Sequence, residues 1–145
     1  MREVIYNQSE RVCRWVGERV NEEDFGPGAV GIGLVKDNEL IAGVVFNRYT
    51  LTDIYMHVAI TNEGGGLTRK FITCCFTYPF IQLGVNRVTG LVRSDNLPAQ
   101  RFDEHLGFKR EGLIRQACED GTDLIVYGML RSECRWIAKE TNHET

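Results

Sequence analysis

Three glycines ahead of a predicted helix start make the segment NEGGGLTRK (62–70) a candidate anion-binding site. Unpaired backbone amides at a helix start attract phosphate groups, and glycines let the backbone approach a ligand closely. Arg69 and Lys70 would add positive charge beside such a site. The segment lacks the Gly-Lys-Ser/Thr ending of a P-loop and the spacing of a dinucleotide fingerprint. An ordinary loop explains the glycines about equally well, so this segment alone does not identify a ligand.

The strand-like stretch DIYMHVAI (53–60) precedes the glycines and could carry a proton acceptor. Side chains in a strand alternate between its two faces, so Asp53, Tyr55, His57 and Ala59 share one face. His57 titrates near neutral pH and could accept a proton directly or through a water molecule. A half-exposed strand histidine without a catalytic role is the alternative. Asp53 is a second candidate, against the simpler reading that it only begins the strand.

The composition predicts one folded domain over residues 1–145. Hydrophobic residues make up 43% of the 145 residues and charged residues 26%, which is typical of a globular chain. The formal net charge of -3 argues against a partner that is a nucleic acid or an anionic membrane. No apolar run approaches the roughly 20 residues that a membrane span needs. The start of the chain has no apolar signal core, so we expect a cytoplasmic protein.

The five cysteines are predicted to be reduced structural thiols, with no metal bound. Their number is odd and no secretion signal accompanies them. No C-x-x-C pair is present, and the three histidines lie far from the cysteines in the sequence. The cysteines are Cys13, Cys74, Cys75, Cys118 and Cys134.

The first half of the chain predicts a short edge strand, a helix and an antiparallel meander. The helix follows the strand at 2–6, and Asn7 with Glu10 forms a predicted capping box at its start. Apolar residues then recur with helical spacing up to the breaker segment NEEDFGPG. The meander strands are expected at 29–35, 40–46 and 53–60.

The second half predicts a long apolar helix at 67–83, in which Pro79 should cause a kink or an early end. A strand at 85–92 follows, parallel to the strand at 53–60. Asn96 is expected to cap the next helix, and Gly107 to end it in a left-handed conformation. Strands at 111–117 and 123–130 then form a hairpin across Asp120-Gly121, before an amphipathic tail at 133–139. The fold class is α+β, with a parallel strand pair inside a mostly antiparallel sheet.

Four stretches, in this order, resemble the GNAT N-acetyltransferase superfamily. They are the glycine loop, YPFIQLGVNRV (78–88), NLPAQRFDEHLGFKREGLIR (96–115) and DGTDLIVYGML (120–130). The resemblance is closest to the branch that includes the ribosomal-protein N-terminal acetyltransferases. It covers about residues 61–131, whereas the first half matches only in the order of its elements. It implies a GNAT-like acyltransferase fold whose parallel strands splay apart.

The resemblance also implies an acetyl-CoA site in the gap between the splayed strands. The pantetheine arm would pair with free backbone groups of residues 56–60, with Val58 and Ile60 as first choices. The pyrophosphate would lie on residues 64–68, and the start of the following helix would border the cofactor. The expected cofactor-binding residues are Val58, Ala59, Ile60, Gly64, Gly65, Gly66, Leu67, Thr68, Arg69, Asn96 and Ala99.

The chain departs from the family pattern at three positions. Glu63 replaces a Gln or Arg of the glycine loop, and Thr68 replaces its final Gly or Ala, where a hydroxyl could compensate as a donor. Asp103 stands where many members carry a Tyr that protonates the leaving thiolate. An ionised aspartate is a poor acid unless its surroundings raise its pKa, so we expect no such role for Asp103. Tyr127, on the last strand, is the expected acid instead.

The sequence therefore predicts an N-acetyltransferase that uses acetyl-CoA and an amine acceptor, by direct attack in a ternary complex. The acceptor is a protein N-terminus, a lysine or a small amine, and the catalytic candidates are His57, Tyr127 and Asp53. One alternative is a GNAT-fold module that binds CoA or a protein partner without turnover. Another is a structural protein, because exposed sheet edges of this fold often pair two copies into a homodimer.

Overall fold

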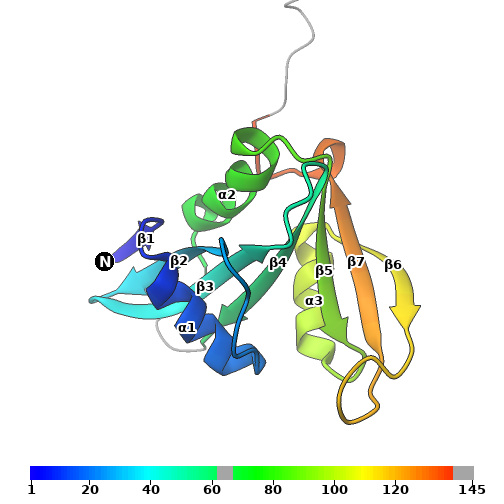
Figure 1. Cartoon of the computed structure of the whole chain (residues 1–145). Coiled ribbons are helices and arrows are strands. Elements are labelled where there is room, and N and C mark those ends of the chain that lie inside the picture. Colours follow the sequence, from blue (N-terminus) through cyan, green and yellow to red (C-terminus); the bar gives the residue numbers. More distant parts are fainter. Residues whose placement is uncertain (62–66, 139–145) are drawn as a thin grey trace, which may run out of the picture.

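The computed structural model describes residues 1–61 and 67–138. A seven-stranded sheet runs through the molecule in the order β1-β2-β3-β4-β5-β7-β6 (Figure 1). The strands are β1 (Arg2–Ile5), β2 (Val30–Lys36), β3 (Glu39–Asn47), β4 (Asp53–Ile60), β5 (Arg87–Arg93), β6 (Lys109–Ile114) and β7 (Leu124–Leu130). The helices are α1 (Ser9–Val20), α2 (Arg69–Thr77) and α3 (Leu97–Leu106), with a π-helical turn η1 (Tyr78–Gln82) and a 3₁₀ turn η2 (Arg131–Glu133). The predicted α+β class and order of elements are confirmed.

The strands β4 and β5 form the parallel pair that the sequence predicts, and they stay paired over a short distance. Residues 53–55 of β4 face residues 87–89 of β5, whereas every other neighbouring pair of strands in the described sheet is antiparallel. Beyond that contact the two strands run apart, as Figure 1 shows. The sheet therefore has two arms, one made of β1–β4 and the other of β5–β7.

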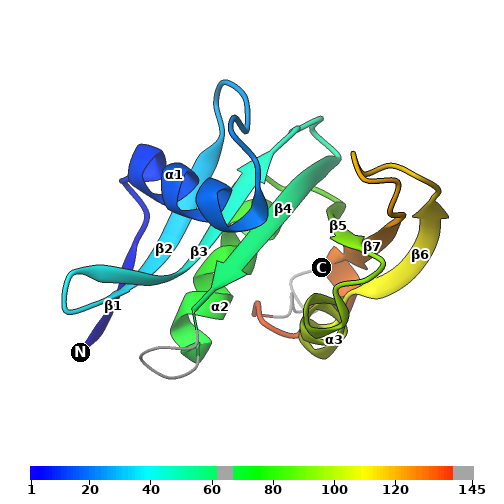
Figure 2. The ribbon, with the colours of Figure 1, turned by 90° about the horizontal axis from the view of Figure 1, so that it is seen from below.

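The helices divide between the two faces of the sheet (Figure 2). α1 buries Val12 and Val16 against the first arm, in a cluster that includes Val45 and Ala59. α2 and α3 pack on the opposite face, where the side chains of α2 and η1 join a larger cluster with residues of both arms. Each fully buried aliphatic or aromatic side chain contributes about 1.5–3 kcal/mol, so both faces are strongly anchored. Within the described ranges, no helix is both long and apolar enough to cross a membrane.

α1 lies unusually close to the sheet because glycines stand beneath it. A Cβ atom added at Gly31 would lie 2.7 Å from Val12, and one added at Gly43 would lie 2.7 Å from Val16. Real side chains do not pack at such distances, so these positions exclude even alanine without movement of the helix.

The start of α1 corrects one sequence prediction. The capping box of Asn7 and Glu10 is wrong, because the helix begins at Ser9 with Gln8 as its N-cap, and Gln8 makes no side-chain capping bond. The hydroxyl of Ser9 instead accepts a hydrogen bond from the backbone amide of Gly31, at 3.0 Å. A contact with β2 thus replaces the local cap that the sequence pattern favours.

The ends of the other two helices agree with the sequence. α2 ends at Thr77 and continues as the π-helical turn that contains Pro79, so the early end at this proline is confirmed. Asn96 caps α3 by accepting a hydrogen bond from the amide of Ala99, at 3.2 Å. Gly107 ends α3 with a φ of 116°, a left-handed conformation that glycine adopts at little cost.

The closing hairpin has a longer loop than predicted. β6 ends at Ile114 rather than at 117, because Gln116 has a φ of 54° and its amide donates to the carboxylate of Asp123, at 2.7 Å. The expected turn is present, since Gly121 donates a backbone hydrogen bond to Cys118.

The tail after η2 forms bends over its described residues, and Lys139 lies outside them.

The close approach of α1 to the sheet predicts that Gly43→Ala lowers the free energy of unfolding by about 1–3 kcal/mol, because the new methyl group must displace Val16. Urea denaturation measures the loss. Gly112→Ala is the matched control, since a Cβ atom on this β6 glycine meets nothing within 4 Å. Equal midpoints for the two variants would contradict the close contact.

Candidate functional site

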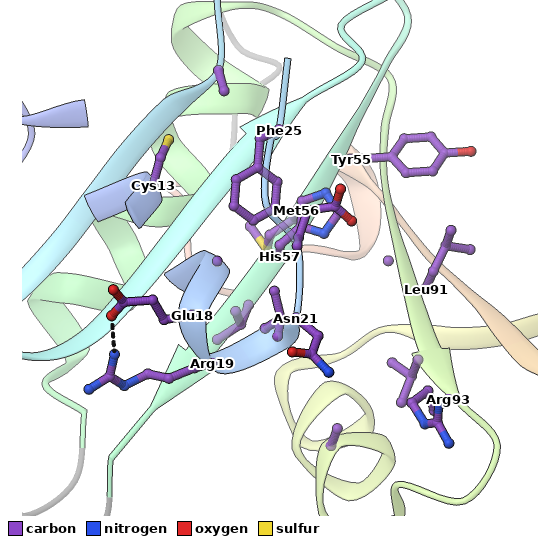
Figure 3. A pocket seen from close by; sticks show the side chains of 18 of the residues that line it. Cys13, Glu18, Arg19, Asn21, Phe25, Tyr55, Met56, His57, Leu91 and Arg93 are labelled. Atoms are coloured by element: carbon purple, nitrogen blue, oxygen red, sulfur yellow. Dashed lines mark ion pairs between the residues drawn. The ribbon is translucent and has the colours of Figure 1, made fainter. Parts of the chain in front are cut away.

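A cleft of about 2100 Å³ opens where β4 and β5 diverge. One wall consists of α1 and the segment that follows it, and the other of β5, the start of α3 and the loop between β6 and β7. Figure 3 shows Phe25 of the first wall beside His57 of β4, with Leu91 and Arg93 on the second wall. The cleft therefore passes between the two arms of the sheet.

The edge of β4 that faces this cleft carries backbone groups that have no partner strand in the part of the chain that the structure describes. Thr61 donates to Ile41 of β3, and the amide of Arg87 donates to the carbonyl of Thr52. Backbone groups alternate along a strand, so even-numbered residues of β4 point away from β3 and toward β5. The ladder with β5 ends at Tyr55, and Val58 and Ile60 have no partner strand on that side among the described residues.

His57 is held in one orientation by its neighbours. Its Nε2 lies 2.8 Å from Oδ1 of Asn47, and the amide nitrogen of Asn47 donates to the carbonyl oxygen of Phe25 at 3.1 Å. Since a carbonyl can only accept, Asn47 must present its oxygen to His57, and Nε2 must carry the proton. The ring also packs on Phe25, with 5.0 Å between ring centroids. Nδ1 is therefore the nitrogen that can accept a proton.

Burial lowers the pKa of His57 to about 4, and the positive charge of Arg48 acts in the same direction. The imidazole is therefore neutral at pH 7. A group with so low a pKa is a weak base toward an ammonium ion, although its free nitrogen can still accept a hydrogen bond.

Asp103 lies in surroundings that shift the pKa of its carboxyl, which the sequence did not predict. It lies on α3, lines the cleft, and holds its Oδ2 only 3.5 Å from the position of a Cβ on Gly90 of β5. Burial, and next the charge of the neighbouring Glu104, raise the pKa of its carboxyl to about 7. The sequence excluded Asp103 as an acid only if its pKa is unshifted, and that condition does not hold, because a carboxyl with a pKa of about 7 is about half protonated at neutral pH.

Tyr127, by contrast, is not among the residues that line the cleft. Its side chain is fully buried, and its hydroxyl donates a hydrogen bond to Oε2 of Glu104 at 2.8 Å. Burial, and next the bond to Glu104, raise the pKa of Tyr127 to about 12. The structure therefore places this hydroxyl beneath α3, against a carboxylate.

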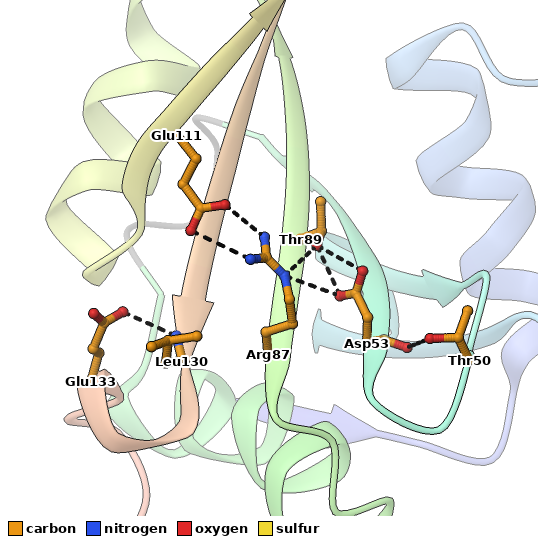
Figure 4. Close-up of polar contacts among 7 residues, drawn as sticks. All are labelled: Thr50, Asp53, Arg87, Thr89, Glu111, Leu130 and Glu133. Atoms are coloured by element: carbon orange, nitrogen blue, oxygen red, sulfur yellow. Dashed lines mark hydrogen bonds and ion pairs between the residues drawn. The ribbon is translucent and has the colours of Figure 1, made fainter.

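Asp53 also lies outside the cleft lining. Its carboxylate accepts the hydroxyl hydrogen of Thr89, with Oγ1 2.8 Å from Oδ1 and 3.0 Å from Oδ2, and it pairs with Arg87 at 3.6 Å. It does share one face of β4 with His57, as the sequence predicts, but its partners are on β5 (Figure 4).

The predicted cofactor residues other than Thr68 and Arg69 fall into three groups. Val58, Ile60, Asn96 and Ala99 line the cleft. Leu67 lines a small apolar cavity of about 20 Å³ between α2 and α3, and Ala59 is buried against α1. Gly64, Gly65 and Gly66 lie outside the described residues, as does Glu63.

Thr68 and Arg69 already have partners within the chain. The hydroxyl of Thr68 is the N-cap of α2 and accepts the amide hydrogen of Phe71, at 3.1 Å. The guanidinium of Arg69 lies over the ring of Trp136, 5.3 Å from its centroid. An anion at this helix start would find the amide of Phe71 already bonded, whereas Thr68 is the acceptor in that bond and keeps its own hydroxyl hydrogen as a donor.

Sequence reasoning missed residues that line the cleft or support its lining. Asn47 was detectable, because it is a polar residue at the end of an otherwise apolar strand. Arg48 was not detectable from the sequence. It has a left-handed φ of 56°, set by the loop after β3, and its guanidinium lies over the ring of Tyr55. Phe25 belongs to the segment NEEDFGPG that ends the first helix, and it lines the cleft, packs in the α1 cluster and supports His57.

The five cysteines are free thiols, as predicted, and Cys75 and Cys134 are buried. Across residues 1–61 and 67–138, no cluster of three or more His, Cys, Asp or Glu side chains could hold a metal ion.

No protein-family model matches the chain. Among curated proteins, it is similar to YokL, an uncharacterised N-acetyltransferase derived from the SPbeta prophage of Bacillus subtilis (strain 168). The two are 28% identical over 129 residues, which cover 82% of this chain and 69% of the relative.

Two solved structures share the fold. A mutant form of spermidine N-acetyltransferase SpeG from Vibrio cholerae gives a TM-score of 0.71 at 15% identity, covering 90% of this chain and 95% of that chain. A candidate acetyltransferase from T. thermophilus gives 0.64 at 23% identity, covering 74% of this chain. The match spans 62% of that protein, less than two thirds of its length. The chain has the GNAT N-acetyltransferase fold, and the matches do not single out the ribosomal-protein branch.

The raised pKa of Asp103 predicts a pH-dependent cost to stability. An unfolded Asp titrates near 3.8 and the folded one at about 7, so between these values the folded state binds more protons. Stability therefore falls as pH rises through this window, and the full cost is present above pH 7. Asp103→Asn removes the charge and should raise the unfolding midpoint more at pH 8 than at pH 5.

Thermal unfolding at both pH values checks this prediction. Glu39→Gln, at an exposed position beside the β2–β3 turn, controls for the loss of one negative charge. An equal gain for Asp103→Asn at pH 5 and pH 8 would contradict the raised pKa.

Proposed function

We propose that this protein is an N-acetyltransferase that uses acetyl-CoA and an amine acceptor, both bound in the cleft between β4 and β5. The observation that carries the proposal is the unpaired edge of β4 at Val58 and Ile60, which faces a large cleft within a GNAT fold. Acetyl-CoA supplies the activated acyl group when it is bound. The names of YokL and SpeG, both N-acetyltransferases, support the same reaction class.

The backbone of β4 fits the pantetheine arm. That arm is an extended chain with two amide groups, and such chains bind exposed strand edges through main-chain hydrogen bonds. Val58 and Ile60 would supply these bonds, while Asn96 and Ala99 border the arm from the start of α3. The segment 64–68 before α2 would receive the pyrophosphate, where the positive end of the helix favours an anion.

Asp103 and His57 are the proposed proton-handling pair. At neutral pH the Asp103 carboxyl can either hold or release a proton, because burial raises its pKa to about 7. It is therefore the proposed general acid. His57 is neutral, and its Nδ1 is the proposed acceptor that orients the incoming amine. Tyr127 and Asp53 carry no direct role in this proposal, since neither lines the cleft.

The acceptor is proposed to be an amine that arrives as a cation. Glu18, Glu22, Glu23 and Asp24 all lie on the cleft wall formed by α1 and the segment after it. Arg14 and Arg19 lie on the same wall, and Arg19 pairs with Glu18, but acidic side chains outnumber basic ones there, so the wall attracts protonated amines. A protein N-terminus, a lysine and a small amine all satisfy this condition.

The alternative is a GNAT-fold module that binds CoA or a protein partner without turnover. The contacts of Thr68 with Phe71 and of Arg69 with Trp136 favour it, because the amide of Phe71 is already bonded and the guanidinium of Arg69 lies over a ring.

Acetyl-CoA is expected to raise the thermal unfolding midpoint, because it binds the folded state alone. At a concentration one hundred times its Kd, the stabilisation is about 2.7 kcal/mol. ADP serves as the control ligand, since it carries a pyrophosphate but no pantetheine arm, and should shift the midpoint less. No shift with millimolar acetyl-CoA would contradict both the enzyme and the CoA-binding module.

Asp103→Asn is expected to lower turnover at least about 100-fold, the usual contribution of a general acid, while the stabilisation by acetyl-CoA is retained. Release of free thiol against a panel of amines and peptides measures turnover. Tyr127→Phe is the matched control and should keep the wild-type rate, because its hydroxyl lies outside the cleft.

Unchanged turnover in Asp103→Asn would remove the acid role of Asp103. His57→Ala should raise KM for the amine more than it lowers kcat, in keeping with an orienting role. Stabilisation of the wild-type protein by acetyl-CoA without turnover of any amine would favour the binding module.

A further inference from the structure

We propose that Asp53, Thr89, Arg87 and Glu111, here called the vertex network, are positioning residues that hold β4 and β5 together at the closed end of the cleft. Through this contact they set the width of the cleft for its ligand. The inference rests on the proposed function for the identity of that ligand, but the network can also be tested without it.

The network lies on the short ladder that joins the two arms. Asp53 is the first paired residue of β4, and Thr89 is the last paired residue of β5. The side chain of Asp53 thus reaches across the whole paired segment to Thr89, as Figure 4 shows. Among the described residues, no side-chain hydrogen bond or ion pair links β4 to β5 outside this network.

One hydroxyl group connects the two charged partners. Oγ1 of Thr89 donates to the carboxylate of Asp53, at 2.8 Å from the nearer oxygen, and accepts from Nε of Arg87 at 3.0 Å. Thr89 is only 4% exposed, so these bonds compete little with water. Removing the hydroxyl would take one hydrogen bond from each of these groups and leave only their direct ion pair, at 3.6 Å.

The network continues from Arg87 across β7 to β6. The guanidinium binds both carboxylate oxygens of Glu111, at 3.0 and 3.4 Å. It passes over Gly128 of β7, where an added Cβ atom would collide with Glu111 Oε2 and with Nη2 of Arg87. A side chain at position 128 would therefore break the connection.

A β-bulge in β6 places Glu111 at the end of this chain of contacts. Arg110 pairs with Tyr127 and Gly112 with Val126, so Glu111 is an extra residue without a partner of its own on β7. Bulges turn a side chain away from its regular alternation, and this one brings Glu111 over Gly128. The bulge at Glu111, the missing side chain at Gly128 and the buried hydroxyl of Thr89 are therefore all needed for this one set of contacts.

None of the four residues lines the cleft. They can act on a ligand only by holding the strands that carry the binding groups, namely the β4 edge at Val58 and Ile60 and the β5 residues opposite. The expected signature is therefore weaker binding with little change in the chemical step.

Thr89→Val keeps the shape of the side chain and removes the hydroxyl, so it is the principal test. We expect the Kd for acetyl-CoA to rise about tenfold, because part of the binding free energy must then hold the two strands in place, with kcat at saturating acetyl-CoA within about twofold of wild type. Thr89→Ser restores the hydroxyl and should restore affinity. Asp53→Asn keeps an acceptor oxygen and should give a smaller change of the same sign.

Lys109→Gln is the matched control. It breaks the ion pair between Lys109 and Glu133, at 2.9 Å, which is similar in length but has no contact with β4. Wild-type affinity in this variant and a tenfold loss in Thr89→Val would support the network. If Thr89→Val lowers the unfolding midpoint but binds acetyl-CoA as the wild type does, the network has only a structural role and the proposal fails.

Amide hydrogen exchange without ligand separates this proposal from the proposed function. In Thr89→Val, the amides of Ile54 and Thr89 in the parallel ladder should exchange faster, while those of β2 and β3 keep their protection. Faster exchange in a protein that does not bind acetyl-CoA would support the network and reject the function. Unchanged exchange of Ile54 and Thr89 would overturn the network.

Discussion

The three-residue parallel contact between β4 and β5 is the constraint on which the rest of the structure depends. A longer ladder would pair the edge of β4 and close the cleft, and a shorter one would leave the arms joined only by helix packing. Unpaired backbone groups cost free energy when they are buried, so such an edge persists only where it faces a solvent-filled cleft. The unpaired edge and the cleft are therefore one feature of the sheet.

Burial has opposite effects on the two ionisable groups of the cleft that matter most. It lowers the pKa of His57 to about 4 and raises that of Asp103 to about 7, because in each case it disfavours the charged form. At neutral pH the imidazole is uncharged and the carboxyl is close to its midpoint. His57 and Asp103 can thus exchange a proton without a permanent charge on either side chain. The acidic residues Glu18, Glu22, Glu23 and Asp24 lie elsewhere, on the wall near α1.

Much of the fold was predictable because its signals are local. Pro79 at the end of α2, Asn96 at the start of α3 and Gly107 at its end act through their own backbone neighbours. The features that could not be predicted depend on contacts across strands. The bulge at Glu111 has no local signature, because Gly128 lies seventeen positions away in the sequence.

The candidate site shows the same division between local and distant causes. The shared face of Asp53 and His57 follows from strand alternation, but their different surroundings do not. The pKa of Asp103 depends on burial against β5, and the exclusion of Tyr127 from the cleft depends on Glu104. From residue type alone, Tyr127 was the expected acid and Asp103 was not. Residue type carries no information about burial or about access to the cleft.

The tail after η2 has a consequence for how the two arms can move. The indole nitrogen of Trp136 donates to the carbonyl of Leu106 at the end of α3, and Arg69 of α2 lies over the same ring. The tail thus ties the helix of one arm to the helix of the other, on the face opposite α1. Together with the side chains at the closed end of the cleft, this gives the molecule attachment points on both faces of the sheet. Side chains on both faces of the sheet therefore restrain the two arms against separation, in addition to the short backbone ladder.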